Sequence, residues 1–513
     1  MFIVSVKHKN WLFLGLIIIL GVFLRSYNLG IDYFWYDEVN SILVANETSF
    51  TLSFFEKCCQ ERNPPLFFIL VKILKVFGSS EAMLRVLPAF FGILTIIAIY
   101  KIGKLIFNDK VALISSLIFS LSPFNVYYSH ELRSYTLFTF IATVSVYCFY
   151  ISLTRNKRWF SYIFFTALCF YTHAFALFLI AAEAIFFISF IRNHRKLLRR
   201  WIISQAAIFL FILPWLPIFV RQAVNAGLSG ELSQWIPESS LSSFLENLRV
   251  FSSGYNAAPD IGSLVILLFG ILFLLGLYFS FYKNKYAAVF TFSWFFIPIL
   301  SAMLISTVVP IYLFRGLIYA SVPYYIFVAY GCYSVYQYTA FIFRKALFCL
   351  VLIAIGLISC MTLRNFYLNI YPSSDFEFSS GVFPRKNMRG VVNYIKDELQ
   401  KKDVIVNTCR SSYLPIYYYI GREYRHKLID KMTPKSYYSA YKNILAVVEM
   451  LPDDINRFGF EYDRIWLVNS SWNPKNMEYQ LDKGTQDWLN NNCVLIKNKD
   501  FEGAQVFLFK VNK

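Results

Sequence analysis

Residues 11–41 have the sequence WLFLGLIIILGVFLRSYNLGIDYFWYDEVNS. The first part, 11–28, is almost entirely apolar and has the length that an α-helix needs to cross a bilayer. No small-residue cleavage site follows it, so we expect a retained anchor rather than a signal peptide. An aromatic pair and two adjacent carboxylates, Asp37 and Glu38, come about ten residues later. Because aromatic rings favour the membrane interface, this order predicts acidic residues held at the membrane surface.

The composition of the 513 residues is typical of a polytopic membrane protein. Hydrophobic residues make up 57% and charged residues 16%, whereas about 25% of the residues of a soluble protein are charged. The mean hydropathy is +0.49. These values exclude a disordered chain, a coiled coil and an ordinary cytosolic enzyme. The net charge of +18 does not indicate a nucleic-acid partner, because most of the excess lies in short loops between apolar runs, where orientation signals occur.

Apolar stretches of membrane-spanning length recur along the first 364 residues. There are eleven: 11–28, 83–103, 111–127, 132–153, 159–172, 174–191, 201–220, 262–282, 286–307, 317–338 and 345–363. The predicted fold class is therefore an α-helical polytopic membrane protein with about 11 transmembrane helices, formed by residues 1–364.

Charge counting predicts the orientation of these stretches. If Leu66–Phe77, which follows two prolines and carries Lys72, does not cross the membrane, one side receives 17 basic residues and one acid, Asp109. If it crosses, the basic clusters divide between the two sides and the positive-inside pattern is lost. Leu66–Phe77 is therefore predicted to be an interfacial or re-entrant helix, with the N-terminus inside. The segments predicted to lie outside are 29–82, 221–261 and 365–513.

The segment 365–513 has the pattern of a small extracytoplasmic α/β domain. Short strands are predicted at Asp403–Cys409, Arg464–Ser471, Val494–Lys497 and Val506–Val511. Helices are predicted between them at Arg389–Lys401 and Asn476–Asn491. Cys409 and Cys493 could pair outside the membrane, although two cysteines alone do not establish the geometry of a disulfide.

Charged residues on the predicted outer side are candidates for a catalytic or ligand-binding site. Asp37 and Glu38 are the first pair, with a structural alternative in which they begin an amphipathic helix over 38–46. Arg85, Arg133 and Arg315 also lie on the outer side, where the orientation rule does not place cations. Three such arginines indicate an anionic partner at that depth, and a lipid phosphate fits; the alternative is that each is a snorkelling anchor.

Other polar residues near the predicted outer ends of the spans have weaker signals. Glu131 and Tyr135 flank Arg133 where the third and fourth spans meet, and a helix-start acid is the structural alternative for Glu131. His173 lies between two spans, where a lone histidine also occurs as a structural residue.

Five stretches in order, with a sixth further on, resemble the GT-C type glycosyltransferases that use polyprenyl-phosphate sugars. The resemblance is to glycosyltransferase family 39, which includes the protein O-mannosyltransferases and the lipid A aminoarabinose transferase. The stretches are WYDEVNS (35–41), NPPLFFIL (63–70), SSEAMLRVLPAFFG (79–92), LSPFNVYYSHELRSYTL (121–137), YTHAFALFL (171–179) and, further on, PIYLFRGLIYASVPYY (310–325). The family pattern usually has His before the proline pair, where this chain has Asn63, which puts a role for that position in doubt.

The resemblance implies an active site on the outer face that is supplied by a lipid-linked sugar. Asp37 matches the family's first-loop catalytic Asp, with Glu38 beside it. A carboxylate can take the proton of an acceptor hydroxyl, and fixed cations stabilise the phosphate that leaves. The residues expected to bind substrate are Arg133, Arg315, Arg85, Glu131, Tyr135, His173 and Lys72. The implied partners are a polyprenyl-phosphate-linked sugar, an acceptor lipid, glycan or protein, and membrane lipids, in a bacterial plasma (inner) membrane with the active site on the periplasmic side.

No cofactor is expected, because the family does not generally need a nucleotide sugar and two adjacent acids do not make a metal site. A divalent cation near the two carboxylates is possible but has no support in the sequence. Three other readings stay open. A transporter or flippase of envelope lipids would share the spans and the basic inner loops, but it predicts half-sequence symmetry that is not visible. The others are a non-catalytic envelope scaffold, and a GT-C type glycan ligase or polymerase.

Overall fold

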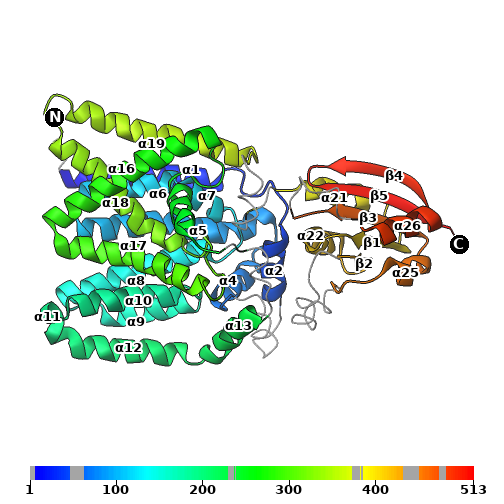
Figure 1. The fold of residues 1–513 in the computed structure, drawn as a ribbon, viewed down its shortest axis with the longest axis horizontal. Helices are drawn as coiled ribbons and strands as arrows, with labels where there is room; N and C mark the ends of the chain where they lie inside the picture. The colour runs from blue at the N-terminus through cyan, green and yellow to red at the C-terminus, as the bar shows by residue number, and fades with distance from the viewer. Residues whose placement is uncertain are drawn as a thin grey trace.

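The computed structural model has a helical bundle and a smaller α/β domain at one end of it (Figure 1). It describes residues 6–46, 63–228, 236, 238–371, 382, 385–430, 450–472 and 481–512. The long helices of the bundle run roughly side by side, with the N-terminus at the end far from the α/β domain.

Each apolar stretch predicted from the sequence overlaps a helix of the bundle. The helices are α1 (Val6–Ser26), α5 (Glu81–Ile106), α6 (Asp109–Leu121), α7 (Pro123–Ser129), α8 (Tyr135–Arg155), α9 (Trp159–Phe170), α10 (Ala176–Ser189), α11 (Ile191–His194), α12 (Leu198–Ile212), α13 (Leu216–Leu228), α15 (Leu241–Ser253), α16 (Pro259–Lys283), α17 (Lys285–Ser306), α18 (Ser321–Tyr338) and α19 (Arg344–Tyr367). Short 3-10 helices lie at η1 (Arg195–Leu197) and η2 (Ile318–Ala320).

Not every one of these helices is long and apolar enough to be a membrane span by itself. Among the described residues, six helices meet both conditions, namely α1, α5, α8, α16, α17 and α19. Two bent pairs add up to two more: α6 with α7, which meet at 59°, and α10 with the stretch Ile191–Ile212, which meet at 85°. Helix α9 has only 12 residues. The chain is a multi-pass membrane protein, while the predicted count of eleven spans is not established.

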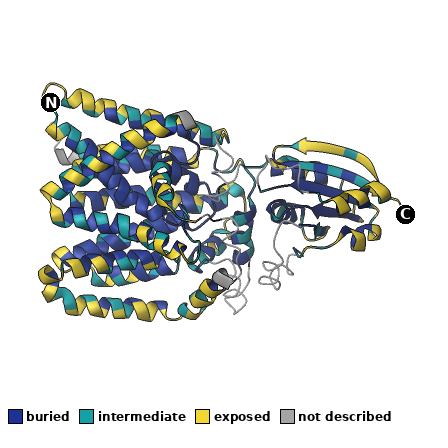
Figure 2. Cartoon of the chain, viewed as in Figure 1, coloured by how far each residue is buried: buried dark blue, intermediate teal, exposed yellow. Residues whose placement is uncertain are grey.

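The bundle is held by close helix packing and by buried side chains such as Arg25. Figure 2 shows the buried residues inside the bundle and the exposed ones on its outer face. Helices α16 and α18 cross where Gly276 faces Phe327, and a Cβ atom on Gly276 would lie 1.8 Å from the Phe327 carbonyl oxygen. Only glycine permits this approach. Arg25 of α1 is fully buried and donates to the carbonyls of Phe119 and Ser120 at 3.3 and 3.1 Å, which fastens α1 to the end of α6.

Two short helices lie near the end of the bundle that faces the α/β domain. Helix α2 (Tyr36–Ala45) contains Asp37 and Glu38 in its first turn, so the structural expectation of a helix near 38–46 is confirmed. Helix α4 (Leu66–Leu74) occupies most of the predicted interfacial helix and packs against α2 and α5. The backbone N–H of Leu66 donates to the carbonyl of Tyr171 at 3.1 Å, which ties the start of α4 to the α9–α10 connection.

The α/β domain has one five-stranded sheet in the order β2-β1-β3-β5-β4. Its elements are α21 (Met388–Lys396), β1 (Asp403–Asn407), α22 (Arg410–Ile420), β2 (Arg425–Leu428), α25 (Ile455–Phe458), η3 (Gly459–Glu461), β3 (Arg464–Ser470), α26 (Lys483–Asn492), β4 (Cys493–Phe501) and β5 (Ala504–Val511). Strands β1, β2 and β3 are parallel, and β5 is antiparallel to both β3 and β4. One face of the sheet packs on α21 and α22 and the other on α25 and α26.

The four predicted strands are present, but other details of this domain differ from the prediction. The predicted helix Asn476–Asn491 begins only at Lys483 in the described part, and 476–480 lie outside the described residues. Cys409 and Cys493 are free, so the structure contains no disulfide between them. The sequence prediction missed α22 and β2. Helix α22 contains Pro415 and four tyrosines, and β2 is only four residues long, so neither has a clear periodic pattern.

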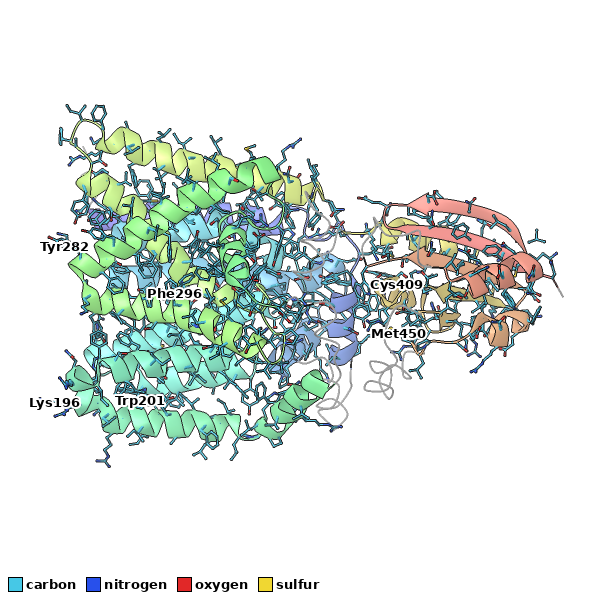
Figure 3. All side chains as sticks on the ribbon, in the orientation of Figure 1. Lys196, Trp201, Tyr282, Phe296, Cys409 and Met450 are labelled. Atoms are coloured by element: carbon cyan, nitrogen blue, oxygen red, sulfur yellow. The ribbon has the colours of Figure 1, made fainter. Side chains whose placement is uncertain are left out.

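The α/β domain docks on the first loop of the bundle. Tyr419 of α22 stacks on Tyr33 with ring centroids 3.9 Å apart, accepts a hydrogen bond from the Phe34 N–H at 2.9 Å and donates to Glu81 at 2.7 Å. Figure 3 shows Cys409 in this domain and Lys196 at the opposite end of the bundle. The first loop and the α/β domain thus lie at the end of the bundle opposite the basic stretch around Lys196, while the side of the membrane that each faces stays a prediction.

Candidate active site

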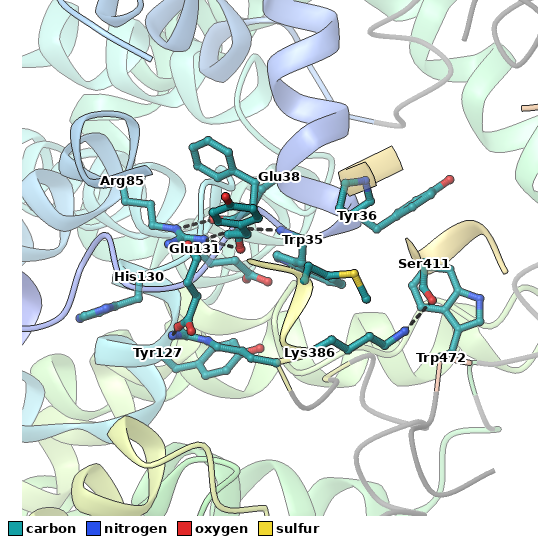
Figure 4. Close-up of a pocket in the computed structure, with 16 residues that line it drawn as sticks. Trp35, Tyr36, Glu38, Arg85, Tyr127, His130, Glu131, Lys386, Ser411 and Trp472 are labelled. Carbon is teal, nitrogen blue, oxygen red and sulfur yellow. Dashed lines mark hydrogen bonds and ion pairs between the residues drawn. The ribbon is translucent and has the colours of Figure 1, made fainter. Parts of the chain in front are cut away.

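The start of α2 is fixed by the buried carboxylate of Glu38. Glu38 is 1% exposed, and its Oε2 accepts from the backbone N–H of Trp35, the N-cap residue, at 3.2 Å. Its Oε1 accepts from the Leu132 N–H at 2.9 Å. Arg85 of α5 donates to both oxygens, from Nε at 2.8 Å and from Nη2 at 2.7 Å (Figure 4). The carboxylate therefore links the first loop, α5 and the α7–α8 connection.

Arg85 has no N–H group left for a ligand. Besides the two bonds to Glu38, Nη1 donates to the carbonyls of Leu29 at 3.2 Å and Asp32 at 2.9 Å, and Nη2 donates to the carbonyl of Tyr33 at 3.3 Å. A guanidinium has five N–H donors, so all of them are used within the chain. The geometry favours a positioning role for Arg85 and Glu38, rather than the binding and catalytic roles expected from the sequence.

Asp37, one residue before Glu38, has a different environment. Its side chain is 22% exposed, and its Oδ2 lies 3.9 Å from Arg315 Nη1. Among the described residues this is the one polar contact of the Asp37 carboxylate. Arg133 approaches the same turn from the α7–α8 connection, because its Nη1 donates to the Asp37 carbonyl and to Ser41 Oγ, both at 3.1 Å. A partly exposed carboxylate beside two arginines can act as a base next to an anion-binding site.

Glu131 lies close to Asp37 and Arg315 and is almost fully buried. It is 6% exposed, and within the described part of the chain its Oε2 has no hydrogen-bond partner. Burial raises the pKa of Glu131 to about 8; Arg315 and Arg133 oppose this increase, and Asp37 adds to it. Burial lowers the pKa of Arg315, but Tyr135 and Asp37 raise it by more, so this guanidinium stays charged. The titration of Glu131 and of Arg315 therefore depends on the same neighbours, which places Glu131, Arg133, Arg315, Tyr135 and Asp37 in one cluster.

His173 lies at the edge of the cluster, and Lys72 lies on the neighbouring helix α4. The His173 ring stacks on Phe138 with centroids 5.0 Å apart, and its Nδ1 accepts from the Phe175 N–H at 3.2 Å. Burial, together with the charges of Arg133 and Arg315, lowers the pKa of His173 to about 3, so the ring is neutral at pH 7. Lys72 is partly buried on α4, which packs against α2.

A cavity of about 70 Å³ lies between the first loop, the α7–α8 connection and the α/β domain (Figure 4). It is lined by Asp32, Tyr33, Phe34, Trp35, Tyr36, Glu38, Arg85, Tyr127, His130, Glu131, Arg385, Lys386, Met388, Ser411, Pro415 and Trp472. The last six come from the C-terminal part of the chain and were not predicted. They lie more than 240 residues from Glu131 in the sequence, and no local pattern marks them as part of this site. Within the described residues, no three His, Cys, Asp or Glu side chains are grouped as metal ligands.

Known proteins resemble the chain in sequence and in fold. The sequence model of the family described as dolichyl-phosphate-mannose-protein mannosyltransferase matches residues 62–218. An uncharacterized protein of Aquifex aeolicus (strain VF5) is 29% identical over 195 residues, which is 36% of this chain and 39% of that protein. This match therefore spans about two fifths of the length of that relative.

Solved structures show the same fold over most of the chain. ArnT from Cupriavidus metallidurans bound to undecaprenyl phosphate has a TM-score of 0.60 at 12% identity, and the match covers 98% of both chains. The oligosaccharyltransferase AglB from Archaeoglobus fulgidus, in complex with an inhibitory peptide and a dolichol-phosphate, has a TM-score of 0.55 at 11% identity over 90% of this chain and 69% of that one. The predicted resemblance to GT-C type glycosyltransferases is confirmed.

Proposed function

We propose that this protein is an integral-membrane glycosyltransferase that moves a sugar from a polyprenyl-phosphate donor to an acceptor hydroxyl on the outer face of the membrane. The observation that carries the proposal is the environment of Asp37. Its carboxylate is partly exposed, accepts no hydrogen bond from the described residues and lies 3.9 Å from Arg315. Two relatives in fold were solved with undecaprenyl phosphate or dolichol-phosphate, which supports a lipid-linked donor.

In the proposed reaction Asp37 is the general base. Its carboxylate takes the proton of the acceptor hydroxyl as the hydroxyl oxygen attacks the anomeric carbon of the sugar. The bond between that carbon and the phosphate oxygen breaks, and the polyprenyl phosphate leaves with the electron pair. Because attack occurs from the face opposite the leaving group, the configuration inverts and no covalent sugar intermediate forms.

Arg315 and Arg133 would stabilise the leaving phosphate. Arg315 carries a fixed positive charge at the Asp37 carboxylate, and Arg133 is held at the same turn of α2 through the Asp37 carbonyl and Ser41. Fixed cations at the point where negative charge develops are an effective form of transition-state stabilisation. We therefore place the donor phosphate on the side of Asp37 that faces these two arginines.

The Asp37→Asn variant tests this assignment. The amide has nearly the same shape as the carboxylate but cannot take a proton at neutral pH, so transfer should fall by about 10²–10⁴-fold. Expression and thermal unfolding should stay close to those of the unchanged protein, because no hydrogen bond to the Asp37 carboxylate is lost. Sugar transfer is measured with radiolabelled polyprenyl-phosphate sugar and the membrane fraction that contains the acceptor.

Glu398→Gln is the matched control, because it makes the same chemical change at a carboxylate that is 55% exposed on the α/β domain. It should retain the rate of the unchanged protein. If purified Asp37→Asn transferred sugar at that rate, Asp37 would not be the base. A Glu38→Gln variant that is inactive although it is as stable as the unchanged protein, beside active Asp37→Asn, would instead assign the base to Glu38.

A further inference from the structure

The α/β domain has a crevice of the kind that binds ligands in parallel sheets. Strand β1 lies between β2 and β3, and all three are parallel. After β1 the chain passes through α22 to β2, which lies on one side of β1. It later enters β3, which lies on the other side of β1, so the direction of the connections reverses between β1 and β3. Open parallel sheets bind ligands at such a position, outside the carboxyl ends of the strands.

Lys386 lies at this crevice. Its Nζ donates to Ser411 Oγ in the first turn of α22, at 2.6 Å, and to the carbonyl of Ser471, which directly follows β3. An ammonium group has three N–H donors, so one of them has no acceptor among the described residues and could serve a ligand. Among the described residues no carboxylate lies within ion-pair distance of Lys386. Burial lowers the pKa of Lys386 to about 8, so the group is still largely charged at pH 7.

The crevice opens into the cavity of the candidate active site. Lys386 and Ser411 line the same cavity as Tyr127 and Glu131, and Figure 4 shows Lys386 reaching from this cavity to Ser411. Asp37 does not line the cavity, but Tyr36 and Glu38 on either side of it do, so a ligand held there by the α/β domain would lie next to the turn of α2 that carries Asp37.

The charges that line this cavity are mostly paired with one another. Arg85 pairs with Glu38, and Arg385 pairs with Asp32. Of the two remaining lining residues with a carboxyl or ammonium group, Glu131 keeps its proton at pH 7 because burial raises its pKa to about 8, whereas Lys386 is charged and has no ion-pair partner within the described residues. A partly buried cation without a counter-ion is costly unless a ligand supplies the opposite charge. Glu131, with its unpartnered Oε2, leaves a second open hydrogen-bonding position in the same cavity.

We propose that this cavity is the acceptor subsite and that Lys386 binds a phosphate-type anionic group of the acceptor. The proposal rests on the proposed glycosyltransferase function. A lysine acts as a compact point charge for phosphate, and the positive end of the α22 dipole adds to it. The donor phosphate lies at Arg315 and Arg133, so the two anions occupy different sides of the site. The acceptor hydroxyl lies between them, near Asp37.

Competitive labelling of the full-length protein tests the subsite without a known acceptor. A trace of a water-soluble acetylating reagent is added to the protein in phosphatidylcholine nanodiscs, and acetylation at Lys386 is measured by mass spectrometry. Inorganic phosphate, compared with sodium chloride at the same ionic strength, should slow acetylation of Lys386 several-fold in a saturable way. Lys483, an exposed lysine at the start of α26, is the control and should not respond.

The same labelling experiment under other conditions identifies the source of the anion. Slower acetylation in phosphatidylglycerol nanodiscs, without an effect of inorganic phosphate, would support the subsite and assign it to a lipid headgroup. An effect of inorganic phosphate alone would support it and assign it to a soluble phosphorylated acceptor. No change in either arm would overturn the proposal. Protection by undecaprenyl phosphate alone would also overturn it, because Lys386 would then belong to the donor side.

Binding of undecaprenyl phosphate separates this proposal from the proposed function. Lys386→Met should retain the affinity of the unchanged protein within about twofold, whereas Arg315→Ala should lose about tenfold or more. A large loss in Lys386→Met, with Lys386→Arg restoring it, would contradict the acceptor assignment and leave the donor site in place. If Arg315→Ala bound undecaprenyl phosphate as tightly as the unchanged protein, the proposed donor site would be contradicted. The acetylation result for Lys386 would not be affected.

Discussion

The Glu38→Gln variant should be destabilised by about 3 kcal/mol, although it exchanges only one oxygen for an NH₂ group. Four N–H groups converge on the Glu38 carboxylate: Nε and Nη2 of Arg85, and the backbone groups of Leu132 and Trp35. A glutamine offers acceptor positions on one oxygen only, so two of these donors would face an NH₂ group. Breaking a buried ion pair by removing one partner costs about 3–5 kcal/mol. Arg85 keeps its three carbonyl partners, which places the expected loss at the lower end of this range.

A double-mutant cycle with Arg85→Met measures the coupling directly. The free energy of unfolding is obtained by titrating the purified protein in detergent micelles with dodecyl sulfate and following tryptophan fluorescence. The loss in the double variant should be smaller than the sum of the two single losses by about 2–3 kcal/mol, because each single variant leaves a buried charge without its partner.

The control for this cycle is the Lys497–Glu398 pair, in which the oxygen of Glu398 lies 2.6 Å from Lys497 Nζ on an exposed surface. Glu398→Gln should cost less than about 1 kcal/mol, since exposed ion pairs contribute little. A loss below about 1 kcal/mol in Glu38→Gln would refute the reasoning. If that variant were as stable as the unchanged protein but inactive, Glu38 would take part in the chemistry instead of positioning α2.

Three further predictions concern the donor site, the pH dependence of stability and the orientation. Arg315→Ala and Arg133→Ala should each weaken use of the lipid donor by about 10- to 100-fold, with only partial rescue by Lys, as measured by transfer against donor concentration. The pKa of Glu131 rises from 4.5 to about 8 in the folded protein, so the unfolded chain releases a proton that the folded protein keeps. The free energy of unfolding should therefore fall as the pH rises between these values, by up to about 1.4 kcal/mol per pH unit, and Glu131→Gln should remove this slope. In intact cells, an impermeant thiol reagent should label Lys483→Cys and not Lys196→Cys in a background without other reactive cysteines; equal labelling of both would contradict the predicted topology.

The helical part of the fold was predictable because membrane spans depend on length and apolarity, which the sequence displays directly. The start of α2 was predictable from a different local signal, because acidic residues favour the first turn of a helix. The number of true spans was not, because α9 is short and α6 and α10 continue into bent partners. The bend between α6 and α7 lies at Ser122 and Pro123, which end one helix and start the next, but these residues do not give the angle between the two helices.

The three outer-side arginines show where prediction of the site from the sequence ends. Arg85, Arg133 and Arg315 give the same signal, a cation on the predicted outer side of the membrane. In the structure the Arg85 guanidinium is saturated by Glu38 and by carbonyls of the first loop, whereas Arg315 faces Asp37. The difference depends on the direction of backbone carbonyls, which no local pattern encodes. Lys386 was missed for a related reason, because only the docking of the α/β domain brings it to the cavity.

The proposed base and the proposed acceptor subsite are joined through a single turn of α2. Glu38 is fixed by Arg85, and Tyr36 packs edge-on against Trp472 of the α/β domain, with ring centroids 5.2 Å apart. Asp37 lies between these two residues, so its direction is set from both sides while its own carboxylate stays open. A base must be held within hydrogen-bond reach of the proton that it takes, and small displacements cost rate. Neighbours fixed on either side of the Asp37 carboxylate meet that requirement, so under the proposed function the docked α/β domain would help to position the base as well as form the proposed acceptor cavity.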